Sequence, residues 1–163
     1  MFEMIFIGKR STSGSGDGFG IFGGGTPGNN GISNYTDKYT YSTNAVAAGS
    51  VLGLARFYLA ATGNSTVGIF GGGYTGSNSN YTDKYTYASN AVAAGSVLGV
   101  AMQALAATGN DTVGIFGGGQ SSAGSASNYT DKYTYSSNAV AAGSVLGVAR
   151  YSLAAASSSP GGF

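Results

Sequence analysis

The chain has 163 residues, a formal net charge of +1 and only 8% charged residues, which leaves room for about one medium-sized domain. A chain this close to neutral lacks the basic surface that nucleic-acid binding needs and the basic run that would hold an anionic membrane. It contains no Cys and no His, which excludes disulfides, thiolate chemistry and most nucleophile–base pairs. We therefore expect a non-enzymatic protein without a cofactor. The Tyr, Asn, Ser, Thr and Gly content is typical of extracellular or virion proteins.

The first 19 residues precede the regular part of the sequence. Phe2–Ile7 is a short apolar run that predicts a strand, and it lacks the basic start and long apolar core of a signal peptide. The Ser/Gly-rich stretch that follows is typical of a flexible linker. Gly18–Gly23 fits the G-x-G-x-x-G pattern, but no helix is expected after it, so we predict no nucleotide site there.

From residue 20 onward the chain is a tandem repeat. The segment GIFGGG occurs three times, and each copy is followed by NYTDKYTY and then by NAVAAGSVLG. Only the stretch after GGG varies in length and content, which marks a surface loop. The sequence divides into repeats at 20–67, 68–113 and 114–156, with a tail at 157–163.

Each repeat contains four short segments with strand character, as the first repeat illustrates. A GIF run stops at the glycines, and the next segment, YTDKYTY, alternates its residues with a period of two. Ala45–Leu52 and Arg56–Ala61 are predicted to form the third and fourth strands, and Thr62-Gly63-Asn64 the turn into the next repeat. The expected fold is all-β, with three four-stranded units.

The alternative for residues 45–61 is a single helix, because the segment AVAAGSVLGLARFYLAA is rich in Ala. Two Gly in each copy argue against it, since each costs about 1 kcal/mol relative to Ala in a helix. Frequent Val and the lack of a polar face also argue against it. Arg56 interrupts the same stretch, so we expect no membrane span there.

The features of the repeat come in a fixed order: a strand that ends in a glycine pair, then a variable loop, then a Tyr-bearing strand, and then an Arg before the last apolar strand. This order resembles the kelch repeat over nearly all of residues 20–156. The resemblance implies four-stranded blades around a central axis, in which glycine would admit a neighbouring backbone. The family's Trp is absent, with Val near its place, and Met102 replaces the Arg of the second repeat. The corresponding residues are Gly24-Gly25, Gly72-Gly73, Gly118-Gly119, Tyr39, Tyr85, Tyr133, Arg56, Arg150, Val46, Val92 and Val140.

Three repeats are fewer than the four to eight blades typical of a β-propeller. The last repeat is as apolar as the middle one and lacks the polar cap that normally ends an array. We therefore expect the chain to bind itself through its repeat ends, most simply as a dimer that closes a ring of six blades. Phe2–Ile7 is expected to complete a blade in its own chain or a partner's. The alternatives are a fragment of a longer array and an open stack or fibre.

The Asp of each TDK segment stands beside a Lys, at Asp37, Asp83 and Asp131. A glycosidase needs two carboxylates in different environments, whereas copied positions of a repeat share one environment. We interpret these residues as solvated charge pairs or turn hydrogen bonds. The alternative is a ring of Asp around an axis, which would suit a hard cation such as Ca²⁺.

Tyr35, Tyr81 and Tyr129 end the variable loops and are the candidate ligand-contact residues. Tyr with Ser, Gly and Asn is typical of adaptable recognition loops, and aromatic faces also stack on sugar rings. The strand tyrosines are expected to pack between blades. Two functions are therefore open: a structural protein that assembles with itself, and a binding module for a glycan or a protein surface. The Gly, Ser, Asn and Thr content of the loops favours the structural protein.

Overall fold

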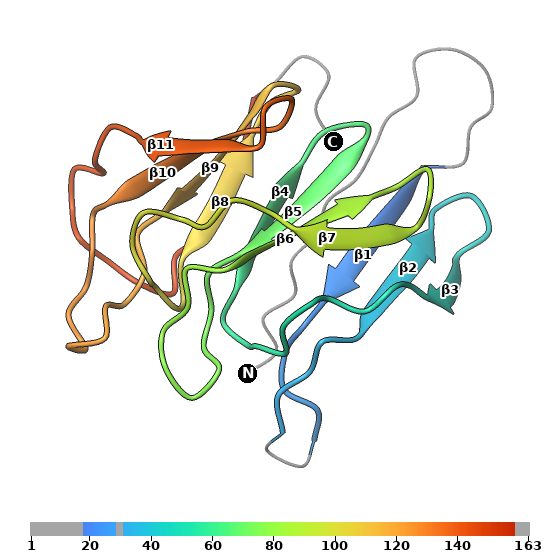
Figure 1. Cartoon of the computed structure of the whole chain (residues 1–163), viewed down its shortest axis with the longest axis horizontal. Coiled ribbons are helices and arrows are strands. Elements are labelled where there is room, and N and C mark those ends of the chain that lie inside the picture. Colours follow the sequence, from blue (N-terminus) through green and yellow to red (C-terminus); the bar gives the residue numbers. More distant parts are fainter. Residues whose placement is uncertain (1–17, 29–30, 159–163) are drawn as a thin grey trace.

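The structure, a computed structural model, describes residues 18–28 and 31–158. These residues form eleven β-strands in three antiparallel sheets, which lie side by side in chain order (Figure 1). The fold is all-β, as the sequence predicted. None of the described residues is helical, so the alternative helix over 45–61 is wrong, and this part of the chain holds no helix that could cross a membrane.

Neighbouring strands of each sheet are joined as hairpins. The first sheet has the order β1 (Phe19–Gly23), β2 (Thr36–Thr40) and β3 (Ala45–Ala48). The second sheet has the order β4 (Ala60–Gly63), β5 (Val67–Gly71), β6 (Thr82–Thr86) and β7 (Ala91–Ala94). The third sheet has the order β8 (Ala106–Gly109), β9 (Val113–Gly117), β10 (Thr130–Thr134) and β11 (Ala139–Ala142).

The GIFG segments form strands because two large apolar residues point to opposite faces of a sheet. In β5, Ile69 and Phe70 are both fully buried, and they belong to different hydrophobic clusters. The strand ends where Gly72 and Gly73 adopt φ angles of 70° and 103°, which glycine reaches without strain. The glycine pair therefore turns the chain out of the sheet and into the variable loop.

A tyrosine–asparagine contact closes the hairpin between β6 and β7. Asn90 lies in the turn with a φ of 53°, a left-handed conformation that Asn tolerates better than most residues. The Tyr85 hydroxyl donates a hydrogen bond to Asn90 Oδ1. The Tyr85 ring is 1% exposed, because it packs between the first and second sheets as expected for a strand tyrosine. The same contact joins Tyr39 to Asn44 and Tyr133 to Asn138.

The last strand of the first two repeats differs from the prediction, and the third repeat forms no such strand among the described residues. In the first repeat it was expected at Arg56–Ala61, but β4 occupies Ala60–Gly63, because Tyr58 has a φ of 55° and interrupts any extended run. In addition, β4 pairs with β5 and so belongs to the sheet of the following repeat. The third strand is also shorter than predicted, at Ala45–Ala48. Each later sheet is therefore assembled from two successive repeats.

This shift leaves the first sheet with three strands in the described part of the chain. No strand among these residues pairs with the outer edge of β1, where the second and third sheets carry β4 and β8. The predicted strand Phe2–Ile7 lies outside the described residues. Within them the three sheets form neither a closed barrel nor a closed propeller.

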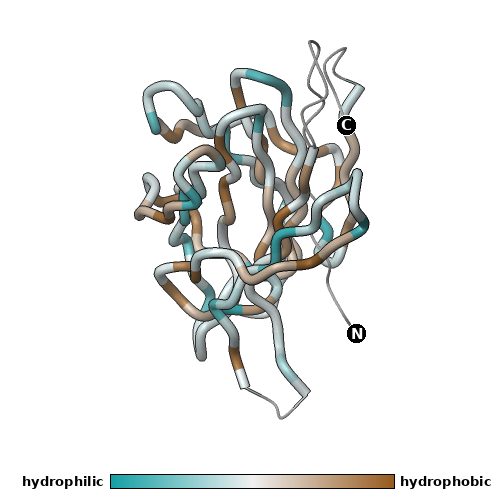
Figure 2. Tube along the Cα trace, turned by 90° about the vertical axis from the view of Figure 1, so that its right-hand side faces the viewer, coloured by the Kyte–Doolittle hydropathy of each residue, from teal (hydrophilic) through white to brown (hydrophobic). Residues whose placement is uncertain are grey.

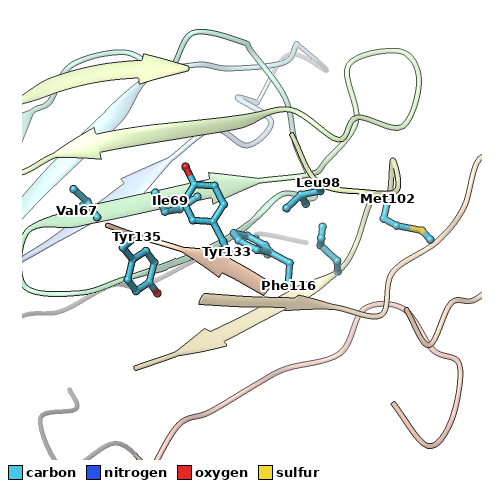
Figure 3. Packing of buried hydrophobic residues seen from close by; sticks show 9 residues of the cluster. Val67, Ile69, Leu98, Met102, Phe116, Tyr133 and Tyr135 are labelled. Atoms are coloured by element: carbon cyan, nitrogen blue, oxygen red, sulfur yellow. The ribbon is translucent and has the colours of Figure 1, made fainter. Parts of the chain in front are cut away.

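The hydrophobic core is divided into two clusters, one between each pair of neighbouring sheets. In the second cluster Val67, Ile69 and Leu98 from the second sheet and its following loop face Phe116 and Tyr133 from the third sheet (Figure 3). The trace is otherwise pale, with short, dispersed hydrophobic and hydrophilic segments (Figure 2). Most of the large buried apolar side chains therefore pack between two neighbouring sheets.

Candidate functional site

The contacts between successive sheets are the places where buried polar groups meet. We call the contact between the first and second sheets the first junction, and the contact between the second and third sheets the second junction. In each junction the Ile face of one sheet packs on the Phe and Tyr face of the next. The equivalent residues are Ile21, Phe70 and Tyr85 in the first junction and Ile69, Phe116 and Tyr133 in the second.

A fully buried ion pair lies in the first junction. Arg56 Nη2 is 2.6 Å from Asp83 Oδ2, and both side chains are 0% exposed. The same nitrogen donates a hydrogen bond of 3.1 Å to the Phe70 carbonyl, and the guanidinium carbon lies 5.2 Å from the centre of the Tyr81 ring. Asp83 Oδ1 accepts a hydrogen bond of 2.9 Å from the Gly53 N–H. An arginine of the first repeat is thus held by a carboxylate, a carbonyl and a ring of the second.

Burial opposes both charges of this pair. It lowers the pKa of the Arg56 guanidinium and raises the pKa of the Asp83 carboxyl, while the opposite charge of the partner acts against burial in each case. Arg56 Nε and Nη1 have no hydrogen-bond partner among the described residues. Removing one member of such a pair leaves the other charge buried and unpaired, which costs more than the pair contributes.

In the second junction Met102 occupies the place that Arg56 has in the first. Met102 is 7% exposed and packs in the hydrophobic cluster (Figure 3). The carboxylate opposite, Asp131, is nevertheless buried, and its Oδ2 accepts a hydrogen bond of 3.1 Å from the Gly99 N–H. Its Oδ1 has no hydrogen-bond partner among the described residues. Burial raises the pKa of Asp131, and the hydrogen bond from Gly99 acts in the opposite direction.

Glycines let the two faces of a junction approach closely. A Cβ atom on Gly71 would lie 2.7 Å from the Phe116 ring, and one on Gly23 would lie 3.0 Å from the Phe70 ring. Real Cβ atoms essentially never lie as close as 2.7 Å to another atom, so a larger residue at Gly71 would force the two faces of the second junction to shift. The sequence predicted the close approach of a neighbouring backbone at the glycine pairs that follow, and this occurs: a Cβ on Gly24 would lie 2.8 Å from the Arg56 carbonyl oxygen.

The structure puts the three candidate ligand-contact tyrosines in different environments. Tyr81 lies beside Arg56 in the first junction, and the half-buried Tyr129 packs against the hydrophobic cluster of the second. Tyr35, the equivalent residue of the first repeat, is 72% exposed. These tyrosines are therefore not brought together, and two of them contact the preceding repeat.

Two outer faces carry the residues that the junctions bury. We call the face of the first sheet that bears Tyr35, Asp37 and Tyr39 the leading face. Asp37 is exposed and Tyr39 is half-buried, whereas the equivalent Asp83 and Tyr85 are 0% and 1% exposed. No other sheet in the described part of the chain covers the leading face.

We call the opposite outer face, on the third sheet, the trailing face; it bears Ile115, Leu146 and Arg150. Ile115 and Leu146 are half-buried and Arg150 is exposed. Their equivalents in the first repeat are almost completely buried, at 0 to 1% exposure. Arg150 makes no ion pair with any described residue. The residues of the first repeat that correspond to Ile115, Leu146 and Arg150 are Ile21, Leu52 and Arg56, in that order.

A cavity of about 550 Å³ opens on the leading face. Its lining includes Phe22, Tyr35 and Asp37, and the variable loop of the first repeat forms one wall. The equivalents of these three residues in the second repeat are the three partners of Arg56. The cavity is thus the counterpart of the space that the arginine fills in the first junction.

The interpretation of the TDK carboxylates as solvated charges is wrong for two of the three copies. Asp83 and Asp131 are buried in the junctions, and only Asp37 is exposed. No group of three acidic residues able to hold a metal ion lies among the described residues, so the alternative ring of Asp does not form there. Sequence reasoning missed the Arg56–Asp83 pair, although the Arg in two of three repeats was a usable signal.

The chain matches no protein-family model. No curated protein is significantly similar to it in sequence.

Proposed function

We propose that this protein is a non-enzymatic structural component whose copies associate through their outer faces into a closed ring, most simply a dimer. One observation carries the proposal: the leading and trailing faces are the two separate halves of a junction that the chain already forms twice internally. Because each face is complementary to the other and not to itself, copies would associate head to tail. Ring closure would bury both faces of every copy.

The kelch-like order of the repeats supports an interpretation of the three sheets as propeller blades. A dimer of this chain would supply six such units, within the range usual for propellers. In such a ring every junction would have the geometry of the first or the second. Head-to-tail contacts that fail to close would instead give an open stack or fibre, which remains the structural alternative.

The proposal is tested by the mass of the purified chain, measured by light scattering over a range of concentrations, together with electron microscopy. We expect a single species of twice the chain mass and ring-shaped particles with six subdivisions. A chain that stays monomeric at every concentration would contradict self-association. Filaments would contradict ring closure but retain the head-to-tail contact.

Binding of a glycan or a protein surface through the variable loops is a second candidate, favoured by the exposed Tyr35 beside the cavity. An exposed aromatic ring next to a hollow is a common platform for a sugar. Glycan-array binding that is lost in Tyr35→Ala and kept in Tyr35→Phe would support this candidate. Array binding equal in both variants, or no binding at all, would count against it.

A further inference from the structure

We propose that the cavity on the leading face binds a guanidinium group, the side chain of an arginine presented by another molecule. The site goes beyond the proposed self-association and does not require it. Four side chains of the cavity lining would form it: Tyr35, Asp37, Phe57 and Tyr58. Asp37 lies in β2, Tyr35 immediately precedes that strand, and the other two lie in the loop before β4. The binding groups therefore do not depend on whether the outer edge of β1 is paired.

The chain already holds a guanidinium in the equivalent space of the first junction. There Arg56 Nη2 donates a hydrogen bond of 2.6 Å to Asp83 Oδ2, and its guanidinium carbon lies 5.2 Å from the centre of the Tyr81 ring. Asp37 and Tyr35 correspond to Asp83 and Tyr81 one repeat earlier. The internal contact is therefore a template for the ligand of the cavity.

The backbone presents the carboxylate and the ring in the same way in both repeats. Each tyrosine leads into an equivalent strand, β2 or β6, and both strands have the sequence TDKYT. The Tyr35 N–H donates to Ser33 Oγ at 3.1 Å, as the Tyr81 N–H donates to Ser79 Oγ at 3.1 Å. Because the same groups are held by the same backbone, we expect them to recognise the same ligand chemistry.

Asp37 is not paired with a cation of the described chain. Its side chain is exposed and forms no ion pair with any described residue. The adjacent Lys38 does not supply the charge, because neighbouring residues of a strand point to opposite faces and its Nζ lies 4.2 Å from the centre of the Phe19 ring. Tyr35 is 72% exposed. A cation from outside the chain would therefore complete the contacts of both the carboxylate and the ring.

A second wall of the cavity is aromatic in the first repeat and not in the second. The rings of Phe57 and Tyr58 lie 4.6 Å apart, and the corresponding residues of the second repeat are Gln103 and Ala104. Tyr58 has a φ of 55°, which is unfavourable for an aromatic residue, yet Ala104 and Ser152 adopt φ angles of 51° and 53° at the same position. The fold therefore needs this conformation but not the Tyr58 ring, which is explained by a ligand.

The chemistry of the cavity favours arginine over other ligands. A planar guanidinium donates two parallel hydrogen bonds to a carboxylate and stacks on aromatic faces, whereas a lysine ammonium is a compact, strongly hydrated charge. A neutral sugar would contact the rings but would not balance the charge of Asp37. The volume of about 550 Å³ lies within the range of about 300 to 1,000 Å³ usual for ligand sites, and it has room for an arginine with flanking backbone.

A short peptide, acetyl-Gly-Arg-Gly amide, is the probe that tests the site. We expect saturable binding in amide NMR titrations, with the largest shifts at Tyr35, Asp37 and Tyr58. The peptide with citrulline in place of arginine has nearly the same shape without the charge and should bind at least tenfold more weakly. The lysine peptide should bind several-fold more weakly. Equal affinity for the citrulline or the lysine peptide would overturn recognition of a guanidinium.

Variants of the chain test the same contacts from the other side. Asp37→Asn should weaken binding of the arginine peptide at least tenfold, because it removes the charge that meets the guanidinium. Asp111→Asn removes an exposed carboxylate elsewhere and is the matched control, with unchanged affinity expected. Tyr58→Ala reproduces the residue of the second repeat and should weaken binding about threefold. Unchanged affinity in Asp37→Asn would overturn the proposal.

The source of the guanidinium is either another protein or Arg150 of a second copy, which is exposed on the trailing face. Equal peptide affinity in Arg150→Gln and in the unaltered chain would assign the ligand to another protein. Tighter peptide binding in Arg150→Gln, with self-association of the unaltered chain reduced by added peptide, would assign it to the second copy; both results support the site. No binding of the peptide by Arg150→Gln would overturn the site and leave the proposed self-association intact, whereas a monomeric chain that binds the peptide would do the reverse.

Discussion

The first and second junctions use the same backbone frame with different chemistry at its centre. In the first, Arg56 and Asp83 form a buried ion pair. In the second, Met102 replaces the arginine, yet Asp131 stays buried, and one of its oxygens has no hydrogen-bond partner in the part of the chain that the structure describes. Buried carboxylates normally need a cation or a full set of hydrogen bonds. The difference shows that the glycine N–H and the aromatic packing suffice to keep the carboxylate in place, whereas the arginine is an addition that one junction does without.

The largest contrast is expected from the same substitution at the two equivalent carboxylates. Asp83→Asn leaves Arg56 buried without a counter-charge and should lower the free energy of unfolding by about 3 to 5 kcal/mol. Asp131→Asn removes a buried charge that forms no ion pair with any described residue, and it should cost less than about 1 kcal/mol or stabilise the protein. Denaturant titration of both variants at neutral pH measures the difference. Equal losses would mean that the ion pair is not the distinguishing feature of the first junction.

The second-largest difference between the two junctions is expected in how stability depends on pH. The raised pKa of Asp131 means that the folded chain binds a proton more tightly than the unfolded chain does. Stability therefore falls as pH rises from the ordinary Asp pKa through the raised value. Met102→Arg brings a cation to this carboxylate and lowers its pKa, which should add about 1 to 2 kcal/mol near neutral pH and less near pH 4.

The control for this variant is Met102→Leu, which keeps the apolar volume and should leave the pH profile unchanged. Thermal unfolding curves collected at several pH values provide the measurement. A Met102→Arg profile parallel to that of the unaltered chain would show that the new guanidinium does not reach Asp131.

Removing one tyrosine hydroxyl from each junction should give a smaller difference in stability, and here the second junction should lose more than the first. In the second junction the Tyr135 hydroxyl lies 2.9 Å from Thr62 Oγ1, and burial raises the pKa of this tyrosine to about 12. In the first junction the buried Tyr87 hydroxyl has no hydrogen-bond partner among the described residues. Tyr135→Phe should cost about 1 kcal/mol, whereas Tyr87→Phe should be neutral or stabilising by a similar amount. Urea midpoints of the two variants compare them directly, and losses of similar size in both would contradict the assignment.

The smallest effect is expected from relief of backbone strain. Ala104 in the second junction has a φ of 51°, a conformation costing a non-glycine residue about 1 to 2 kcal/mol. Ala104→Gly removes that cost but loosens the unfolded chain, so the net gain should be about 0.5 kcal/mol. Ala107→Gly in β8, where φ is negative, should instead destabilise the protein. A melting temperature raised in the first variant and lowered in the second is the expected result.

The sequence predicted those features that depend on neighbouring residues. The period-two pattern of TDKYT, the stop at the glycines and the turn at Asn64 gave an all-β fold, and Asn64 Oδ1 does accept the Thr66 and Val67 N–H groups. The prediction that the last strand of a repeat lies in the sheet of its own repeat was wrong. Pairing of β4 with β5 depends on the positive φ of Tyr58, which no local pattern signals. The buried ion pair was missed because Asp83 stands beside a Lys in sequence, while its true partner is 27 residues away.

The displacement of β4 and β8 into the sheet of the following repeat also bears on how such a protein can change in evolution. The last strand of one repeat belongs to the sheet of the next repeat, so neighbouring repeats overlap and cannot separate without breaking a sheet. Duplication or loss of one whole repeat, 46 or 48 residues between successive Asp positions, would recreate the overlap without any new contact. The number of repeats can therefore change by recombination, while each contact between neighbouring sheets is inherited unchanged.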